Sequence, residues 1–274
     1  MARPPRLQFP DAIYHVSARG NERAAIYRNE GDRRYFLQLL ADAVRREHWR
    51  VLAYCLMTNH YHLLVQTPVP NLARGMRQLN GVYAQSFNRR HARVGHLFQG
   101  RYAARIVQED AHLLLAVRYV VRNPVRARLC RDPEEWRWSS HRAALGTEPA
   151  WFLDRGSLLS YFGSSPGEAL AGYRDYCREP DSPALDRHPL IDGDETFTVT
   201  TLERIEPVPG IPRRYFQSPR PALAALLTAS GPDAITAARE AGYGVREIAR
   251  HLGVAPSTVS RRLRGRSGLA TNGT

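Results

Sequence analysis

Two histidines stand two positions apart in the segment NHYHLLV, where residues 60–66 are typical of a β-strand. Side chains on a strand alternate between its two faces, so His60 and His62 point to one face and Tyr61 points to the other. Two imidazoles on one face can bind a single divalent ion. Pairs of this kind also occur without any metal, so the spacing alone leaves a surface or core role open.

A tyrosine and an asparagine complete this candidate site from a second segment, RYVVRNP. Tyr119 and Asn123 lie four residues apart on a predicted helix over residues 110–122, which places them on one helical face. The Asn amide oxygen is a hard ligand, and Mg²⁺ or Mn²⁺ bound to it keeps positions open for water and phosphate oxygens. The tyrosine hydroxyl would then lie beside a bound phosphate as a nucleophile. The alternatives are a buried helix tyrosine and a helix stop before Pro124.

Arginine is concentrated in the segment RRHARVGHLFQGR, which covers residues 89–101. Basic side chains interleaved with aromatic ones suit a hairpin stem or unpaired bases. The alternative is the solvated end of a helix. The predicted DNA contacts of this region are Arg89, Arg90, Arg93, Arg101 and Arg105.

The charge of the chain favours a nucleic-acid partner. All 39 basic residues are Arg, against 26 acidic residues, so the 274-residue chain has a formal net charge of +13. Residues 1–150 contain 24 Arg and 12 acids, residues 151–220 contain 8 and 11, and residues 221–274 contain 7 and 3. A GC-rich codon bias explains the absence of Lys. It does not explain the excess of positive charge, which attracts polyanions through counterion release.

The elements that must position these residues follow the order β-α-β-β-α-β-α. This order predicts an α+β fold, a ferredoxin-like antiparallel sheet with helices on one face. Asp32 is the predicted N-cap of the first helix, and the apolar stripe of the second helix is predicted to be core. The predicted strands cover residues 11–18, 51–57, 60–66 and 102–107, and the predicted helices cover residues 32–48, a segment opening at Asn71, and 110–122.

The C-terminal part has the spacing of a helix-turn-helix domain. Gly253 suits the left-handed conformation of a turn and Pro256 the first turn of a second helix. The outward residues of that helix, which are predicted to enter a major groove, are Ser257, Thr258, Ser260, Arg261, Arg262 and Arg264. The alternative is a helical hairpin with a solvated Arg face. The predicted domains are 1–150 for catalysis, 151–180 as a helical extension, 181–220 as a Pro-rich linker, 221–266 for the helix-turn-helix and 267–274 as a tail.

Several classes of protein are disfavoured. No stretch approaches the roughly 20 apolar residues of a membrane span, and the N-terminus lacks the apolar core of a secretory signal. The three cysteines are far apart, which disfavours a disulfide framework and a cysteine zinc site and favours the cytoplasm. The absence of an obvious acidic cluster disfavours a carboxylate-based two-metal nuclease.

Five segments together resemble the REP-associated tyrosine transposases, which are IS200-like, single-tyrosine HUH transposases. All five lie within residues 1–180. The first runs from YHV at residue 14 to RGN, which ends at residue 21, and the others are AYCLMTNHYHLLV, NRRHARVGHLFQGRY, RYVVRNPVRA and WRWSSHRA. The resemblance implies that His60, His62 and Asn123 bind the metal and that Tyr119 is the nucleophile. It also implies an enzyme that nicks and rejoins single-stranded DNA at hairpin-forming repeats through a 5′-phosphotyrosine intermediate. Many relatives end soon after this domain, so the C-terminal helices are a departure.

Two other functions remain open from the sequence. One is a non-catalytic DNA-binding regulator that uses the helix-turn-helix domain beside a decayed nuclease domain. The other is a metal-dependent phosphodiesterase that hydrolyses without a covalent step. The expected partners are single-stranded and hairpin DNA, with duplex DNA at the C-terminal domain. A homodimer is also open, because Tyr119 can act in its own subunit or in a partner's.

Overall fold

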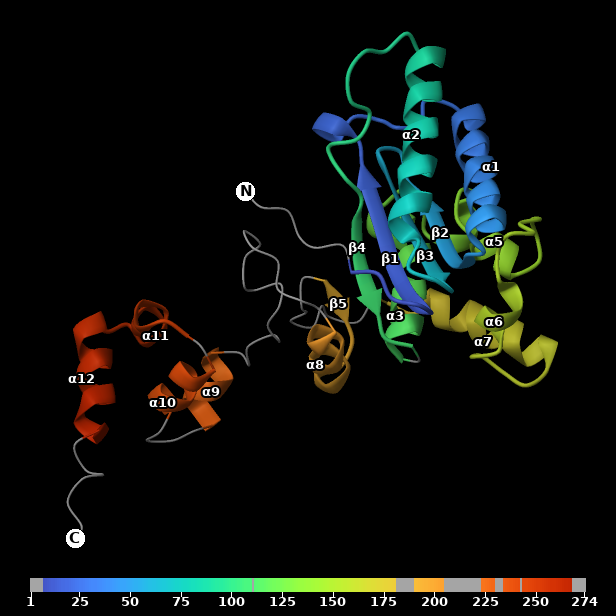
Figure 1. The fold of residues 1–274 in the computed structure, drawn as a ribbon. Helices are drawn as coiled ribbons and strands as arrows, with labels where there is room; N and C mark the ends of the chain where they lie inside the picture. The colour runs from blue at the N-terminus through green and yellow to red at the C-terminus, as the bar shows by residue number, and fades with distance from the viewer. Residues whose placement is uncertain are drawn as a thin grey trace. The chain divides into compact units, whose positions relative to one another are not determined.

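A computed structural model describes residues 7–109, 111–180, 190–204, 223–229, 234–241 and 243–267. The chain divides into two compact units, residues 1–217 and residues 218–274 (Figure 1). Within the described ranges, no helix combines the length and the apolar character needed to cross a membrane.

The first unit is an α+β domain, as predicted. Its elements are β1 (Ala12–Arg19), η1 (Asn21–Arg23), α1 (Glu30–Glu47), β2 (Arg50–Leu56), β3 (His60–Thr67), α2 (Leu72–Arg90), β4 (Ala103–Val107), α3 (Ala111–Val121), α4 (Asn123–Arg126), η2 (Pro133–Glu135), α5 (His141–Ala144), α6 (Arg155–Leu159), α7 (Pro166–Arg178), β5 (Ile191–Asp192) and α8 (Glu195–Glu203). The first seven predicted elements are therefore confirmed in type and order.

The sheet has the strand order β2-β3-β1-β4-β5. β1 is central and pairs antiparallel with β3 and β4, and β2 pairs antiparallel with β3. β5 pairs parallel with β4, through Ile106 opposite Ile191 and Val107 opposite Asp192. The prediction of a purely antiparallel sheet is therefore corrected to a mixed sheet. β5 escapes sequence analysis because two residues are too few to show alternation.

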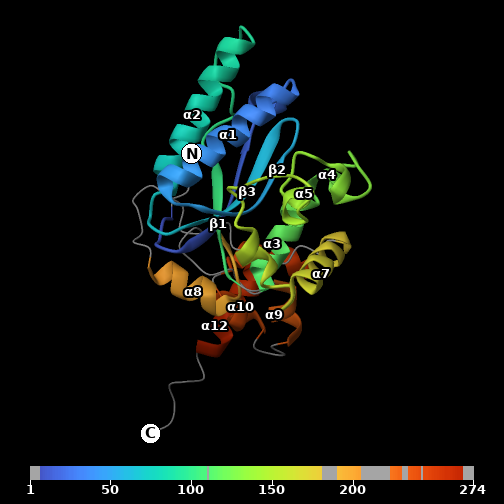
Figure 2. The ribbon, with the colours of Figure 1, turned by 90° about the vertical axis from the view of Figure 1, so that its right-hand side faces the viewer.

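Helices cover both faces of the sheet (Figure 2). On one face the ring of Tyr61 in β3 lies 4.8 Å from that of Phe36 in α1, and its hydroxyl donates to Asn80 in α2. On the other face α3 lies against β3, with the ring of Tyr119 5.6 Å from that of His62. The prediction of helices on one face is therefore wrong. Six of the seven β2 residues are buried, which is the pattern of a strand covered on both sides.

The start of α1 also differs in detail from the prediction. Asn29 is the N-cap, and its side chain accepts a hydrogen bond from the backbone N–H of Asp32. Asp32 is fully buried and accepts hydrogen bonds from the backbone N–H of Arg28 and from Arg90 and His91 at the end of α2. The buried carboxylate thus joins the first turn of α1 to the last turn of α2. The apolar stripe of α2 is core, as predicted.

Residues 190–204 correct the prediction of a linker over 181–220. They form β5 and α8, and the backbone N–H groups of Ile106 and Gln108 donate to carbonyls of Leu190 and Asp192. Residues 181–189 and 205–220, the rest of the predicted linker, lie outside the described residues.

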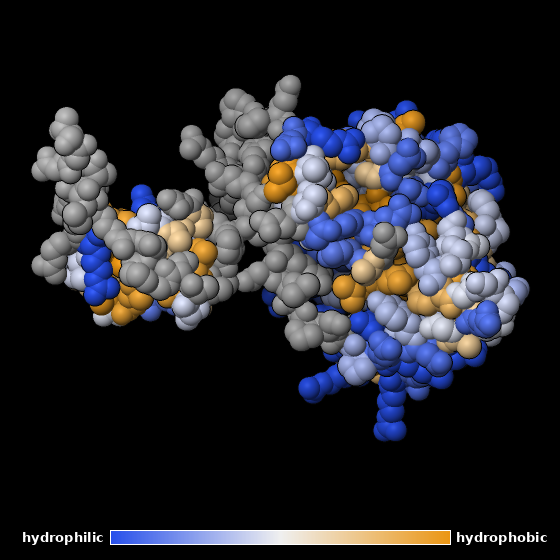
Figure 3. Space-filling model, turned by 90° about the horizontal axis from the view of Figure 1, so that it is seen from below, coloured by the Kyte–Doolittle hydropathy of each residue, from blue (hydrophilic) through white to orange (hydrophobic). Residues whose placement is uncertain are grey.

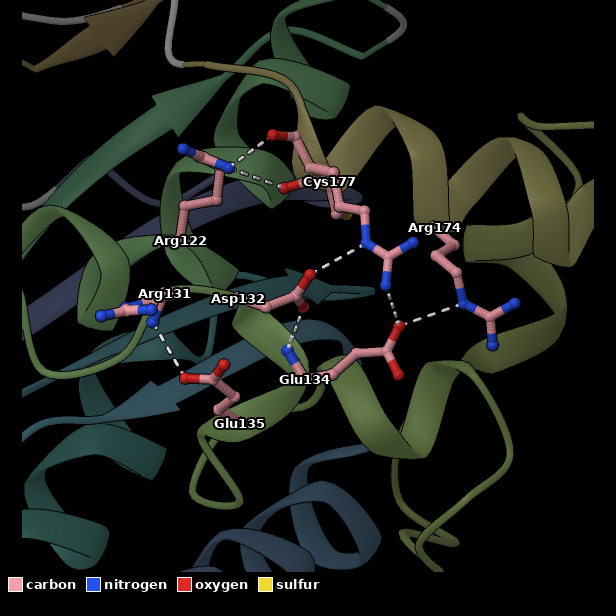
Figure 4. Close-up of polar contacts among 8 residues, drawn as sticks. Arg122, Arg131, Asp132, Glu134, Glu135, Arg174 and Cys177 are labelled. Atoms are coloured by element: carbon pink, nitrogen blue, oxygen red, sulfur yellow. Dashed lines mark hydrogen bonds and ion pairs between the residues drawn. The ribbon is translucent and has the colours of Figure 1, made fainter.

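Ion pairs attach α7 to the segment that follows α4 (Figure 4). Arg178 donates to Asp132 and Glu134, and Arg174 donates to Glu134. The guanidinium of Arg122, after α3, donates to the carbonyls of Cys177 and Arg178 at the end of α7. These contacts anchor α3, the helix that carries Tyr119, to the rest of the domain.

The second unit contains α9 (Leu223–Ala229), α10 (Ala234–Glu240), α11 (Val245–Leu252) and α12 (Pro256–Ser267). Its core includes Ala238, Ile248, Ala249 and Val259, with partly buried apolar residues around them. Gly253 ends α11 in the left-handed conformation, with φ of 64°. That conformation suits glycine and turns the chain into α12, as the sequence predicts.

The face of the first unit seen in Figure 3 is mainly hydrophilic, with small hydrophobic areas between polar side chains. Such scattered apolar residues are usual on the surface of a water-exposed domain.

Candidate active site

The polar face of the sheet collects side chains from three neighbouring strands. Ser17 of β1 lies opposite His62 of β3, and Arg19 lies opposite His60. Arg105 of β4 lies opposite His15 of β1. Directly opposed residues of an antiparallel pair share a face, so these six side chains project from the same side of the sheet. The side chains of this polar face are those of His15, Ser17, Arg19, His60, His62 and Arg105.

His60 and His62 lie together, as the two-residue spacing predicts. Their ring centroids are 5.1 Å apart, His62 is 7% exposed and His60 is half-buried. Both rings border a cavity of about 350 Å³ that Arg19 and Arg101 also line. The cavity therefore offers two imidazoles and two cationic side chains to one ligand.

The Nδ1 atom of each ring is held by a neighbour. Nδ1 of His60 lies 2.7 Å from Oδ1 of Asn59, and Nδ1 of His62 lies 2.9 Å from Nε2 of His15. The amide oxygen of Asn59 is an acceptor, so His60 donates from Nδ1. Nε2 is then the nitrogen of His60 that can bind a ligand.

Both imidazoles are neutral at neutral pH. Burial lowers the pKa of His60 to about 4, and the positive charge of Arg19 acts in the same direction. Burial also lowers the pKa of His62 well below its usual value, assisted by His15, His60 and two nearby arginines. A neutral imidazole is the form that can donate a lone pair to a metal ion.

Tyr119 of α3 lies against the histidines. Its ring centroid is 5.6 Å from that of His62 and 5.4 Å from that of His15, with edge-on geometry in both pairs. The guanidinium of Arg126, in α4, lies 4.3 Å from the centroid of the same ring. The tyrosine and the histidine pair, from segments almost 60 residues apart in the chain, therefore meet on one face of the sheet.

Asn123 begins α4, one helical turn beyond Tyr119, and is 9% exposed. Its amide nitrogen donates to the backbone carbonyl of Tyr119 at 2.9 Å. The side-chain oxygen is then the atom of Asn123 that can accept a hydrogen bond or bind a cation.

Two arginines that lie near Tyr119 in the sequence, Arg118 and Arg122, have partners in and beside α7. Arg118 donates to Glu179 and lies over the ring of Tyr176, and Arg122 donates to carbonyls at the end of α7. Both side chains thus connect α3 to α7. The cation over the Tyr119 ring is Arg126, which the sequence analysis did not select.

The five arginines predicted to contact DNA have different environments. Arg101 lines the cavity beside His60 and His62, and Arg89 is exposed at the end of α2.

The other three of these arginines have partners within the protein. Arg90 forms an ion pair with the buried Asp32, and Arg93 donates to Asn88. Arg105 makes a two-pronged ion pair with Asp192 of β5, at 2.8 and 2.9 Å.

Arg105 and Asp192 line a second, smaller cavity of about 140 Å³. His15, His112 and Tyr119 line it as well, so the tyrosine borders this cavity and also contacts His62. The cavity was not predicted, because it depends on β5.

Sequence analysis also missed His15 and Arg19. Both belong to the YHV-to-RGN segment, but neither received a role. The polar alternation His15, Ser17, Arg19 along one strand is the signal that places them on the face of the two histidines.

A second polar cluster contains Asp132, Glu134 and His141, whose ligand atoms lie within 4.8 Å of one another. Arg174 and Arg178 already neutralise the two carboxylates. Adding a divalent cation would require displacing these guanidinium groups. We therefore interpret this cluster as the ion-pair attachment of α7 drawn in Figure 4.

In the second unit, the predicted groove-reading residues lie on α12. Ser257 and Arg262 are exposed, and Thr258 is half-buried. The side chains of Ser260, Arg261 and Arg264 lie outside the described part of the chain.

Two segments of the chain match families of known proteins. Residues 8–123 match the family described as Transposase IS200 like, and residues 233–266 match the family described as Helix-turn-helix domain. No curated protein matches the chain. Residues 8–123 are therefore similar to the IS200-like transposases, a class of DNA-processing proteins, and the predicted helix-turn-helix is confirmed.

Two solved structures are similar to part of the chain. One is a REP-associated tyrosine transposase bound to a REP hairpin, with 17% identity and a TM-score of 0.45, covering 54% of this chain and 89% of that chain. The other is a candidate transposase from Deinococcus radiodurans R1, with 18% identity and a TM-score of 0.31, covering 47% of this chain and 92% of that chain.

Proposed function

We propose that this protein is a metal-dependent transposase that cuts and rejoins single-stranded DNA through a covalent bond to Tyr119. The observation that carries the proposal is the contact of the Tyr119 ring with the rings of His62 and His15. A phenol, which is a nucleophile for phosphorus, thus lies beside the neutral imidazole of His62 in a domain that matches the IS200-like family.

The donor set fits a divalent cation. His60 and His62 would bind it through imidazole nitrogen, and Asn123 would bind it through its amide oxygen. The histidines are neutral, half-buried or buried, and held at Nδ1, which are the usual properties of ligating imidazoles. Mixed nitrogen and oxygen donors suit Mn²⁺ or Mg²⁺ with open positions. When bound, the cation polarises the scissile phosphate and neutralises charge on its non-bridging oxygens.

The protein's own residues position the DNA and the nucleophile. Arg19 and Arg101 line the cavity beside the histidines, where a phosphate of a single strand would be neutralised. Tyr119 attacks phosphorus through its hydroxyl oxygen, whose proton passes to solvent, while Arg126 packs over its ring. The bond from phosphorus to the 3′ oxygen breaks, which leaves a 3′-hydroxyl and a 5′-phosphotyrosine. Attack by another 3′-hydroxyl reverses these bond changes and joins two strands.

The helix-turn-helix unit would add contacts to duplex DNA. α12 presents Ser257 and Arg262 to solvent, and such side chains can reach base edges or phosphates in a major groove. The proposed partners are therefore single-stranded or hairpin DNA at the first unit and duplex DNA at the second.

The test uses hairpin oligonucleotides with randomised single-stranded flanks and a label at the 3′ end. Incubation with Mn²⁺ followed by a denaturing gel should show labelled DNA attached to the protein. Tyr119→Phe should abolish that band, whereas Tyr35→Phe, a half-buried tyrosine of α1, should retain it.

Two outcomes would contradict the proposal. Cleavage that survives Tyr119→Phe would indicate hydrolysis without a covalent step. Hairpin binding with no cleavage in either Mn²⁺ or Mg²⁺ would indicate a regulator.

A further inference from the structure

His15 contacts both His62 and Tyr119. Its Nε2 lies 2.9 Å from Nδ1 of His62, its ring stacks on that of His62 at 5.1 Å with an interplanar angle of 27°, and it meets the edge of Tyr119 at 5.4 Å. β1, which carries His15, is the central strand of the sheet and is paired on both sides. A side chain on such a strand has a well-defined position.

The short distance between the two ring nitrogens requires one proton between them. If His62 carries its proton on Nδ1, it donates to His15, and Nε2 of His62 keeps a lone pair for a ligand. If His15 donates instead, neutral His62 carries its proton on Nε2 and cannot bind a cation there. The contact with His15 therefore determines which nitrogen of His62 is available.

The same arrangement occurs at His60, whose Nδ1 donates to the amide oxygen of Asn59. Both imidazoles of the pair are thus held at Nδ1 by a neighbouring side chain. Outer groups that accept a hydrogen bond from a ligating histidine fix its tautomer and ring orientation in many metal sites.

We propose that His15 is a positioning residue that accepts a hydrogen bond from the Nδ1–H of His62 and directs the Nε2 lone pair of His62 toward the divalent cation. This inference rests on the proposed metal-dependent function. Because His15 also contacts Tyr119, it aligns the nucleophile and the proposed ligand from one point on β1.

The first test is carried out on the full-length protein without metal. Long-range ¹H–¹⁵N correlation spectra of ¹⁵N-histidine-labelled protein distinguish the two neutral tautomers. His62, assigned with His62→Gln, should carry its proton on Nδ1. Observation of the Nε2-protonated tautomer would overturn the inference.

The second test measures Mn²⁺ affinity by electron paramagnetic resonance of the free ion. His15→Phe keeps a ring against His62 and Tyr119 but removes the acceptor, and should weaken Mn²⁺ binding by roughly 10- to 100-fold. His15→Gln keeps an acceptor at a similar distance and should stay within about threefold of the wild type. His96→Phe, in an exposed position of the loop after α2, serves as the control.

The outcomes separate this inference from the proposed function. If the wild type binds Mn²⁺ and His15→Phe binds it equally well, His15 does not position His62. If His15→Gln loses as much affinity as His15→Phe, the acceptor argument fails. If the wild type itself binds no Mn²⁺ or Mg²⁺, the proposed metal dependence fails, whereas the tautomer of His62 still tests the hydrogen bond.

Discussion

At the scale of single residues, the site depends on two imidazoles that stay neutral. Burial is the main cause of the low pKa values of His60 and His62, and positive neighbours add to it. Neutral rings cannot form ion pairs with phosphates, so we expect them to bind the cation rather than the DNA backbone. Arg19 and Arg101, which line the same cavity, are better suited to the phosphates.

Replacing either histidine should therefore separate cleavage from binding. We expect His60→Ala and His62→Ala to reduce strand cleavage at least about 100-fold and to leave hairpin affinity within about threefold. Cleavage is measured on denaturing gels and affinity by fluorescence anisotropy. His251→Ala, an exposed histidine on α11, should cleave normally. An equal loss of hairpin affinity in both site variants would show that the imidazoles contact DNA directly.

The sequence predicted the pair of histidines because residues two positions apart on a strand point to the same face. It also predicted that Tyr119 and Asn123 share a helical face. It did not predict His15 or Arg126, because their roles arise from contacts between β1 and β3 and between α4 and the Tyr119 ring. The catalytic roles of all these residues remain predictions.

At the scale of elements, Asp32 joins the helices that cover the face of the sheet opposite the site. Burial by itself would raise the pKa of Asp32, but hydrogen bonds from the Arg28 backbone, His91 and Arg90 outweigh it and hold the pKa below its usual value. The ionised carboxylate therefore stabilises the folded state. This stabilisation is complete above the unfolded pKa of about 4 and is lost as the pH falls through the lower folded value.

We expect Asp32→Asn to lower the free energy of unfolding by about 2 kcal/mol at pH 7, because it weakens several charge-assisted hydrogen bonds. The difference from the wild type should shrink as the pH falls below about 4. Urea denaturation followed by circular dichroism measures both effects. Asp42→Asn is the matched control, since Asp42 is only half-buried and lies 3.8 Å from Arg45. Equal stability of Asp32→Asn and the wild type at pH 7 would contradict this account of the α1–α2 junction.

Element order was predictable because the helices of the first unit have clear apolar stripes and the central strands alternate. The two-sided sheet was not, since a continuous apolar run such as that of β2 does not reveal how many faces are covered. β5 was not predicted because its two residues form a strand through pairing with β4, and their own sequence shows no strand pattern.

At the scale of the whole molecule, the chain combines a segment that matches the IS200-like transposase family with a helix-turn-helix domain. The residues proposed for catalysis all lie in the first unit, and the predicted groove-reading residues all lie in the second. Cleavage of a single strand and binding of a duplex should therefore be separable.

Removal of residues 218–274 should weaken duplex binding at least about tenfold and change single-strand cleavage by less than about threefold. Electrophoretic mobility shifts and the cleavage gel measure the two activities. In the full-length chain, Arg262→Ala should also weaken duplex binding, because this exposed arginine lies on α12. Unchanged affinity of the truncated protein for every duplex tested would argue against a DNA-binding role for the second unit.

The central claim is that Tyr119 becomes covalently attached to DNA beside the two histidines. The most direct measurement is mass spectrometry of the purified adduct after digestion with protease and nuclease. We predict a nucleotide joined through its 5′ phosphate to the peptide that contains Tyr119. A nucleotide on any other residue, or DNA cleavage without a modified peptide, would contradict the account.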